Sequence, residues 1–137
     1  MASQGKLAPV EIAVDASALL AILLGEPDAE AYSAKLLAAS RVWISPVNWW
    51  EVQVRMRVRY GPAGEAQSAA WMTKAGVEIE PITARHAQLA LDAFARYRAR
   101  PAALNLGDCF AWALATAKNL PLLYKGDDFP HTGVTAV

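Results

Sequence analysis

Four separate segments of the chain carry carboxylates where a predicted strand meets a helix or a loop. Asp15 directly follows the first predicted strand, and Glu51 lies early in the helix predicted after the second. Asp108 lies at the start of the helix before the fourth strand, and Asp127 and Asp128 follow that strand. If the strands are parallel, these carboxylates can meet at one edge of the sheet, where ligands of such sheets bind.

A cluster of carboxylates without histidine or cysteine is suited to hard divalent cations such as Mg²⁺ and Mn²⁺. Two such ions about 4 Å apart can activate water and stabilise the leaving oxygen in phosphodiester cleavage. Asp15 and Asp108 lie in apolar surroundings (IAVDASALLAILL and LNLGDCFAWALA), where an aspartate is costly unless it is paired or binds a metal. Without metal the carboxylates repel one another, so we expect at least one raised pKa and weaker activity below neutral pH.

Each acid also has a simpler interpretation. Asp15 and Asp108 could cap the helices that follow them, and Glu51 could pair with Arg55 one helical turn later. Asp127 and Asp128 after a glycine suit an ordinary turn. The argument for a metal site therefore depends on the joint occurrence of the acids at element ends.

The elements that would position these acids alternate between strands and helices. Short β-branched or apolar runs predict strands at 10–14, 42–45, 77–80 and 121–124, with a last edge strand at 134–137. Helices are expected at 16–24, 28–39, 47–59, 65–74, 83–98 and 107–119, separated in part by turns at 60–64 and 126–133. The segment 47–59 alternates like a strand, but its length and the Glu51–Arg55 spacing favour a helix. Asp28 and Thr83 are candidate N-caps, and Gly76 is a candidate C-cap.

Strands separated by helices predict right-handed crossovers and a parallel sheet of four to five strands flanked by helices. The chain has 137 residues, of which 55% are hydrophobic and 19% charged, with 13 basic and 13 acidic residues. This composition excludes a disordered chain and a binder that relies on bulk positive charge. We expect one α/β domain over residues 1–137, with residues 1–9 flexible.

The single cysteine, Cys109, excludes an intrachain disulfide and a cysteine-based metal cluster, and we expect it to be a small buried side chain. The longest apolar runs, such as 18–24, are much shorter than the roughly 20 residues of a membrane span. The first residues lack the layout of a signal peptide. A cytoplasmic protein is the expectation.

Five segments in family order resemble PIN domains, and specifically the VapC toxins of bacterial toxin–antitoxin pairs. They are VDASALLAILLGEPDAE, SPVNWWEV, PITARHAQLALDAFARY, LNLGDCFAWALA and LLYKGDDF. The resemblance implies a PIN-like α/β fold and a Mg²⁺- or Mn²⁺-dependent ribonuclease. It also implies a homodimer and a cognate VapB-type antitoxin that occupies the acidic cleft, often with a basic side chain.

By position, Asp15, Glu51 and Asp108 match the three main acids of the family and would hold one or two metal ions. Asp127 or Asp128 would be the fourth acid, and the sequence does not distinguish them. Ser17 matches the family's small hydroxyl residue, and Asn48 stands near a Ser or Thr of other members. Where close relatives often continue with a Thr-Asp pair, this chain has Thr132 followed by glycine.

Several other residues could contact RNA. Arg55 belongs to one of two basic segments, at 55–59 and 96–100, that are either solvated or bind an RNA backbone or an acidic partner. The five tryptophans could stack bases, although most are expected in the core or a dimer interface. His131 lies near the acidic loop, whereas His86 is expected at a surface or interface.

Two other functions compete with a ribonuclease. A phosphatase with an aspartyl nucleophile would need a second acid two residues after Asp15, where this chain has Ser17. A non-catalytic binding module would not need candidate acids at every expected element end. The RNA target is open, and a tRNA loop is one candidate because single-stranded loops expose their bases.

Overall fold

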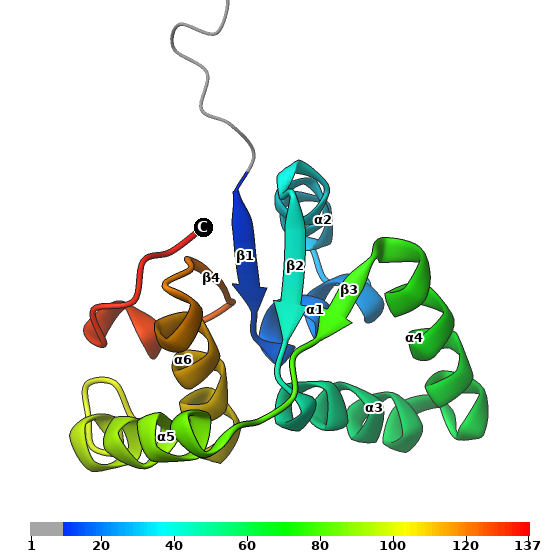
Figure 1. Cartoon of the computed structure of the whole chain (residues 1–137). Coiled ribbons are helices and arrows are strands. Elements are labelled where there is room, and N and C mark those ends of the chain that lie inside the picture. The colour runs from blue at the N-terminus through cyan, green and yellow to red at the C-terminus, as the bar shows by residue number, and fades with distance from the viewer. Residues whose placement is uncertain (1–9) are drawn as a thin grey trace, which may run out of the picture.

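A computed structural model of the chain describes residues 10–137, so the expectation for residues 1–9 lies outside the described part. Four parallel strands form one sheet in the order β3-β2-β1-β4 (Figure 1). The strands are β1 (Glu11–Val14), β2 (Arg41–Ile44), β3 (Val77–Ile79) and β4 (Leu122–Leu123). The predicted parallel α/β architecture is confirmed.

In the described part of the chain, six α-helices and one short 3₁₀ helix connect and cover the strands. They are α1 (Ala16–Leu23), α2 (Ala29–Ala38), α3 (Pro46–Tyr60), α4 (Pro62–Ala75), α5 (Ala84–Tyr97), α6 (Leu106–Lys118) and η1 (Phe129–His131). The segment with strand-like alternation is therefore helical, because α3 spans all of it.

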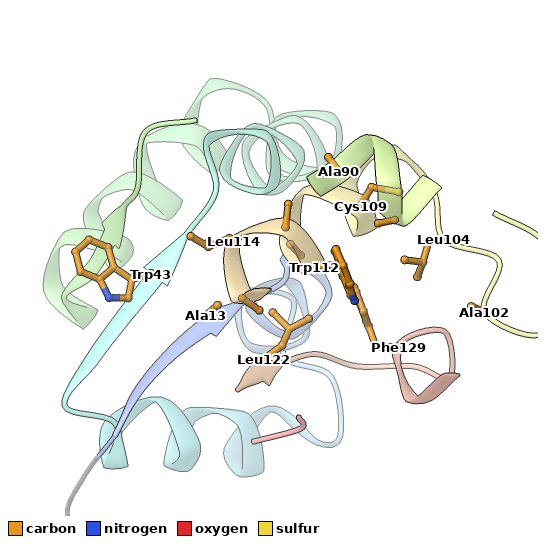
Figure 2. Packing of buried hydrophobic residues seen from close by; sticks show 14 residues of the cluster. Ala13, Trp43, Ala90, Ala102, Leu104, Cys109, Trp112, Leu114, Leu122 and Phe129 are labelled. Carbon is orange, nitrogen blue, oxygen red and sulfur yellow. The ribbon is translucent and has the colours of Figure 1, made fainter. Parts of the chain in front are cut away.

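The core consists of two apolar clusters, one on each face of the sheet. Successive strand residues point to opposite faces, so Ala13 joins the cluster under α5 and α6, while Ile12 and Val14 join the other. Figure 2 shows the first cluster, in which Trp112 of α6 lies near Leu122 and Phe129. The second cluster includes buried residues of α1, α2 and α3. The sheet is thus the middle of three layers.

Two predicted boundaries are wrong. Residues 134–137 form no strand, because only one bridge joins Ala136 to Leu122. The turn expected at 60–64 shrinks to Gly61, since α3 continues to Tyr60 and α4 begins at Pro62. Proline is favourable in a first helical turn, where its missing N–H costs nothing.

The predicted caps are confirmed in part. Thr83 caps α5 and Gly76 ends α4 with a positive φ of 74°. Asp28 precedes α2, but its side chain makes no capping bond. His86 was expected at a surface or interface, yet its residue is only 7% exposed. Its Nδ1 accepts the Thr83 N–H and so completes the capping box of α5.

The fold directs two strand ends toward the same region. The arrowheads of β1, β2 and β3 in Figure 1 point toward the end of the sheet where α3 and α5 lie. β1 leads directly into Asp15, and β2 leads into Ser45, which caps α3. Among residues 10–137, no helix is long and apolar enough to cross a membrane.

Candidate active site

Asp15 is buried at the carboxyl end of β1 and is only 4% exposed. Its Oδ2 accepts the Ser17 N–H at 3.0 Å, so it is the N-cap of α1. The capping interpretation and the site interpretation are compatible, because Oδ1 is not used by the cap. One oxygen holds the helix start, and the other has only a long contact of 3.5 Å with Asn48 Nδ2, while Asp15 also lines the pocket.

Glu51 is held in place by Asn48 and Gly107. The buried Asn48 side chain donates from Nδ2 to Glu51 Oε1 at 2.9 Å and to the Gly107 carbonyl at 2.9 Å. The same nitrogen lies 3.5 Å from Asp15 Oδ1. A Cβ added to Gly107 would overlap the Glu51 carboxyl group. Asn48 therefore ties α3 to the start of α6 and fixes the direction of Glu51.

Asp108 lies in the first turn of α6 as part of a capping box with Asn105. Asn105 Oδ1 accepts the Asp108 N–H at 2.9 Å, and Asp108 Oδ2 accepts the Asn105 N–H at 3.0 Å. The N-cap of α6 is thus Asn105, and the expectation that Asp108 itself could be the cap is wrong. The reciprocal bonds orient the Asp108 carboxylate at the helix start.

These three acids line one open pocket of about 350 Å³. Its wall also contains Ser17, Asn105 and residues of the outer face of α3. A larger hollow of about 550 Å³ lies between α2 and α4, but no acidic residue lines it. The chemistry predicted from the sequence therefore belongs to the smaller pocket.

The electrostatics of the pocket are those of crowded carboxylates without a compensating cation. Burial raises the pKa of Asp15 and Glu51, against the effect of their hydrogen bonds from Ser17 and Asn48. Burial also raises the pKa of Asp108 to about 7, and the charges of Asp15, Asp128 and Glu51 add to that rise. The expectation of at least one raised pKa is confirmed, although burial contributes more than the expected repulsion between the acids.

The donor set fits a divalent cation of the Mg²⁺ type. Asp15, Glu51 and Asp108 each use one oxygen for a short hydrogen bond, and the second oxygen has at most a long contact, that of Asp15 Oδ1 with Asn48 at 3.5 Å. Within residues 10–137, no three acidic, histidine or cysteine side chains are close enough, as they lie, to ligate one ion directly. Mg²⁺ keeps several waters and needs only one or two direct carboxylates, so the remaining acid can act through water.

The loop after β4 is attached to the same region by Lys125. Its backbone N–H donates to Ser17 Oγ at 2.9 Å, and its Nζ lies 3.1 Å from both Glu26 and Asp28. Asp28 is thus used by an ion pair instead of a helix cap. Lys125 joins this loop to the first and second helices.

Of the two candidates for a fourth acid, Asp128 is the one whose charge acts on the other acids. Both are exposed, but the charge of Asp128 contributes to the raised pKa of Asp15 and of Asp108. Asp127 is not among the main charges that act on either group. His131 is exposed at the end of η1 and does not line the pocket.

Replacement of Lys125 by methionine is expected to loosen this loop and reduce cleavage severalfold. The change removes both ion pairs while the methionine retains the length of the side chain. Faster amide hydrogen exchange in residues 125–131 would report the loosening. Arg57→Gln, which removes an exposed ion pair with Glu65, is the control. Equal exchange in the two variants would contradict the assigned role.

The remaining candidates differ in what their side chains contact. Ser17 and Asn48 contribute hydrogen bonds that position acids and loops. Arg55 is exposed and lines the pocket, and its expected pairing with Glu51 is wrong because Asn48 is the partner of Glu51. Cys109 is buried as expected.

Sequence reasoning missed the roles of Asn105 and Gly107. Asn105 stands three residues before Asp108, and that spacing is the signature of a capping box. No local sequence pattern indicates the need for a glycine at position 107, because the group that requires it is the carboxyl group of the distant Glu51. Contacts across long sequence separations require the fold.

Comparisons with known proteins agree with this architecture. The PIN domain family model matches residues 12–134. Ribonuclease VapC30 of Mycobacterium tuberculosis is 37% identical over 127 residues, which are 90% of this chain and 96% of the relative.

Two solved structures share the fold. The crystal structure of M. tuberculosis VapC20, described as a sarcin–ricin loop cleaving toxin, has a TM-score of 0.75 at 22% identity. The match covers 92% of this chain and 98% of the VapC20 chain. A toxin–antitoxin complex from Klebsiella pneumoniae has a TM-score of 0.71 at 20% identity and covers 92% and 96% of the two chains. With its curated relatives and the matched domain, this chain belongs to the VapC ribonucleases of the PIN-domain family.

Proposed function

We propose that this chain is the toxin of a toxin–antitoxin module and cleaves RNA phosphodiester bonds at a Mg²⁺ or Mn²⁺ site. The observation that carries the proposal is the convergence of Asp15, Glu51 and Asp108 in one open pocket, with a raised pKa on each. Such a concentration of negative charge is favourable only when a cation binds there.

In this proposal Asp15, Glu51 and Asp108 would hold the cation. A bound cation would supply an activated water and neutralise charge at the phosphodiester. Ser17, Asn48 and Asn105 keep the three carboxylates oriented through hydrogen bonds. Asp128 is exposed and its charge acts on Asp15 and Asp108, so it is suited to position water or complete a second cation site.

The proposed partners rest on the family and on the complexes that structural relatives form. We propose a VapB-type antitoxin, since one structural neighbour is a toxin–antitoxin complex. A homodimer, an RNA substrate such as a tRNA and a cytoplasmic location complete the proposal. A basic antitoxin side chain would be attracted to the acidic pocket in place of the cation.

Inducible expression in bacteria, with growth and RNA 5′ ends as readouts, tests the function. The parent chain should arrest growth and create new 5′ ends, and the double variant Asp15→Asn/Asp108→Asn should do neither. New 5′ ends that persist in the double variant would sink the assignment. Calorimetric titration adds an independent measurement, because no Mn²⁺ binding at millimolar concentration would favour a non-catalytic module.

A further inference from the structure

Trp50 differs from the other tryptophans, all of which lie in the described part of the chain. Trp43 and Trp112 are buried in the first apolar cluster, and Trp49 and Trp71 pack against the second. Trp50 belongs to neither cluster and is 63% exposed. Stability of the monomer does not explain an indole in this position.

The exposed indole lies on the wall of the acidic pocket. Trp50 precedes Glu51 on α3 and lines the same pocket as Asp15 and Asp108. Val54, one turn later and 37% exposed, extends this apolar wall. A molecule that reaches the carboxylates therefore passes beside a flat aromatic surface.

Arg55 lines the pocket on the other side of Glu51. At about 100° per residue, Trp50 lies about 100° to one side of Glu51 around the helix, and Arg55 about 40° to the other. Within residues 10–137, Arg55 makes no ion pair or hydrogen bond, whereas Arg57 pairs with Glu65. Its guanidinium is available for an anionic ligand.

We propose that Trp50 and Arg55 form a subsite for one nucleotide of single-stranded RNA beside the scissile phosphate. The indole stacks on the base, and the guanidinium contacts a backbone phosphate. This inference rests on the proposed function and adds the two residues that recognise one nucleotide beside the site of cleavage. A base paired inside a duplex cannot reach a side-chain platform, so the nucleotide must come from a loop, a bulge or an end.

Binding to a short single-stranded oligoribonucleotide tests the subsite. All variants are compared in the Asp108→Asn background with Mg²⁺ present, so that the strand stays intact, and Kd is read by fluorescence anisotropy. Trp50→Ala should weaken binding about tenfold, within the range of one stacked base, and Trp50→Phe should restore most of it. Val58→Ala is the control, because Val58 lies on the same helix, is 80% exposed and does not line the pocket.

The role of Arg55 is tested by a substitution with a matched control on the same helix. Arg55→Gln should weaken binding and reduce its salt dependence by about one counterion. Arg59→Gln, one turn further along α3 and outside the pocket, should change neither. Equal effects of the two substitutions would show that only general charge matters and would overturn the role of Arg55.

Abasic nucleotides identify stacking directly. In the chain with native acids, removal of the base at one position next to the mapped cleavage site should raise KM for the parent but not for Trp50→Ala. A Trp50→Ala variant that responds to every abasic position as the parent does would overturn the proposal. A change in oligomeric state in solution for Trp50→Ala would also overturn the proposal, since the indole would then serve a contact between two copies of the chain.

Failure of this inference differs from failure of the proposed function. If the parent cleaves RNA and Trp50→Ala has the same KM and Kd, only the subsite is wrong. If the parent neither cleaves RNA nor binds Mn²⁺, the proposed function is wrong.

Discussion

Asp108→Asn is expected to cleave RNA more than a hundredfold more slowly and yet to unfold at a higher temperature in EDTA at pH 8. Loss of a metal-binding carboxylate should exceed the roughly 10- to 100-fold effect typical of residues that only orient such ligands. Stability moves in the opposite direction, because the half-buried carboxylate lies near Asp15, Asp128 and Glu51 without a cation. Asparagine removes that charge and keeps the oxygen that accepts the Asn105 N–H.

The pH dependence of this effect has a definite sign. The pKa of Asp108 is raised from 3.8 to about 7 in the folded chain. Between these values the folded state binds a proton that the unfolded state has lost, so the contribution of this group to stability falls as pH rises and levels off above the folded pKa. The Tm of the metal-free parent should therefore decrease from pH 5 to pH 8 more than the Tm of Asp108→Asn. Asp15 and Glu51, whose pKa values are also raised, leave a smaller dependence in the variant.

Added Mg²⁺ should offset the loss of stability that the charged Asp108 carboxylate causes in the parent. A ligand that binds only the folded state raises stability with the logarithm of its concentration relative to its Kd. Differential scanning fluorimetry at pH 8, with EDTA and with Mg²⁺, should show a larger Tm increase for the parent than for Asp108→Asn. Asp92→Asn is the control, since Asp92 lies on α5 and accepts a hydrogen bond from Gln88. A lower Tm of Asp108→Asn in EDTA at pH 8 would contradict the electrostatic account.

The sequence predicted the strands and the meeting of the acids because both depend on local patterns and one topological rule. Short apolar runs separated by helices require a parallel sheet, and residues that follow such strands meet at one edge. Asp15 could therefore be assigned to the pocket from its place after β1 alone. Glu51 was harder, because its position within α3 depends on the helix being chosen over a strand.

The errors concern which of several possible partners each acidic side chain takes. Local spacing suggested that Glu51 pairs with Arg55, but Asn48 binds Glu51 and also reaches Gly107, 59 residues away from Asn48. Asp28 was expected to cap a helix, but it meets Lys125 from the far end of the chain. A helical spacing identifies which side chains can meet, and only the packed fold decides which partner is closer.

Gly107→Ala is expected to reduce cleavage by roughly ten- to a hundredfold, as removal of a residue that orients a metal ligand does. The new Cβ would occupy the space of the Glu51 carboxyl group. That group is the end of a flexible side chain, so it can rotate away at low cost to the fold. Displacement would break its hydrogen bond with Asn48 and remove the carboxylate from its place beside Asp15.

Stability should not follow activity in this variant. Alanine is favoured over glycine by about 1 kcal/mol in a helix interior, and at the second residue of α6 a smaller gain of the same sign offsets part of the cost of moving Glu51. We expect Gly107→Ala to keep the Tm of the parent within a few degrees in EDTA. Mn²⁺ affinity, measured by calorimetry, should fall together with the cleavage rate.

A double-mutant cycle shows whether Gly107 acts through Glu51. In a Glu51→Ala background there is no carboxyl group to displace, so Gly107→Ala should cause no further loss of Mn²⁺ affinity. Interacting residues give such non-additive effects, whereas independent residues give effects that add. If the two losses in affinity add fully, Gly107 acts on the site by a route other than Glu51. Near-complete non-additivity would establish that the glycine is required because a carboxylate from another helix occupies the space of its missing side chain.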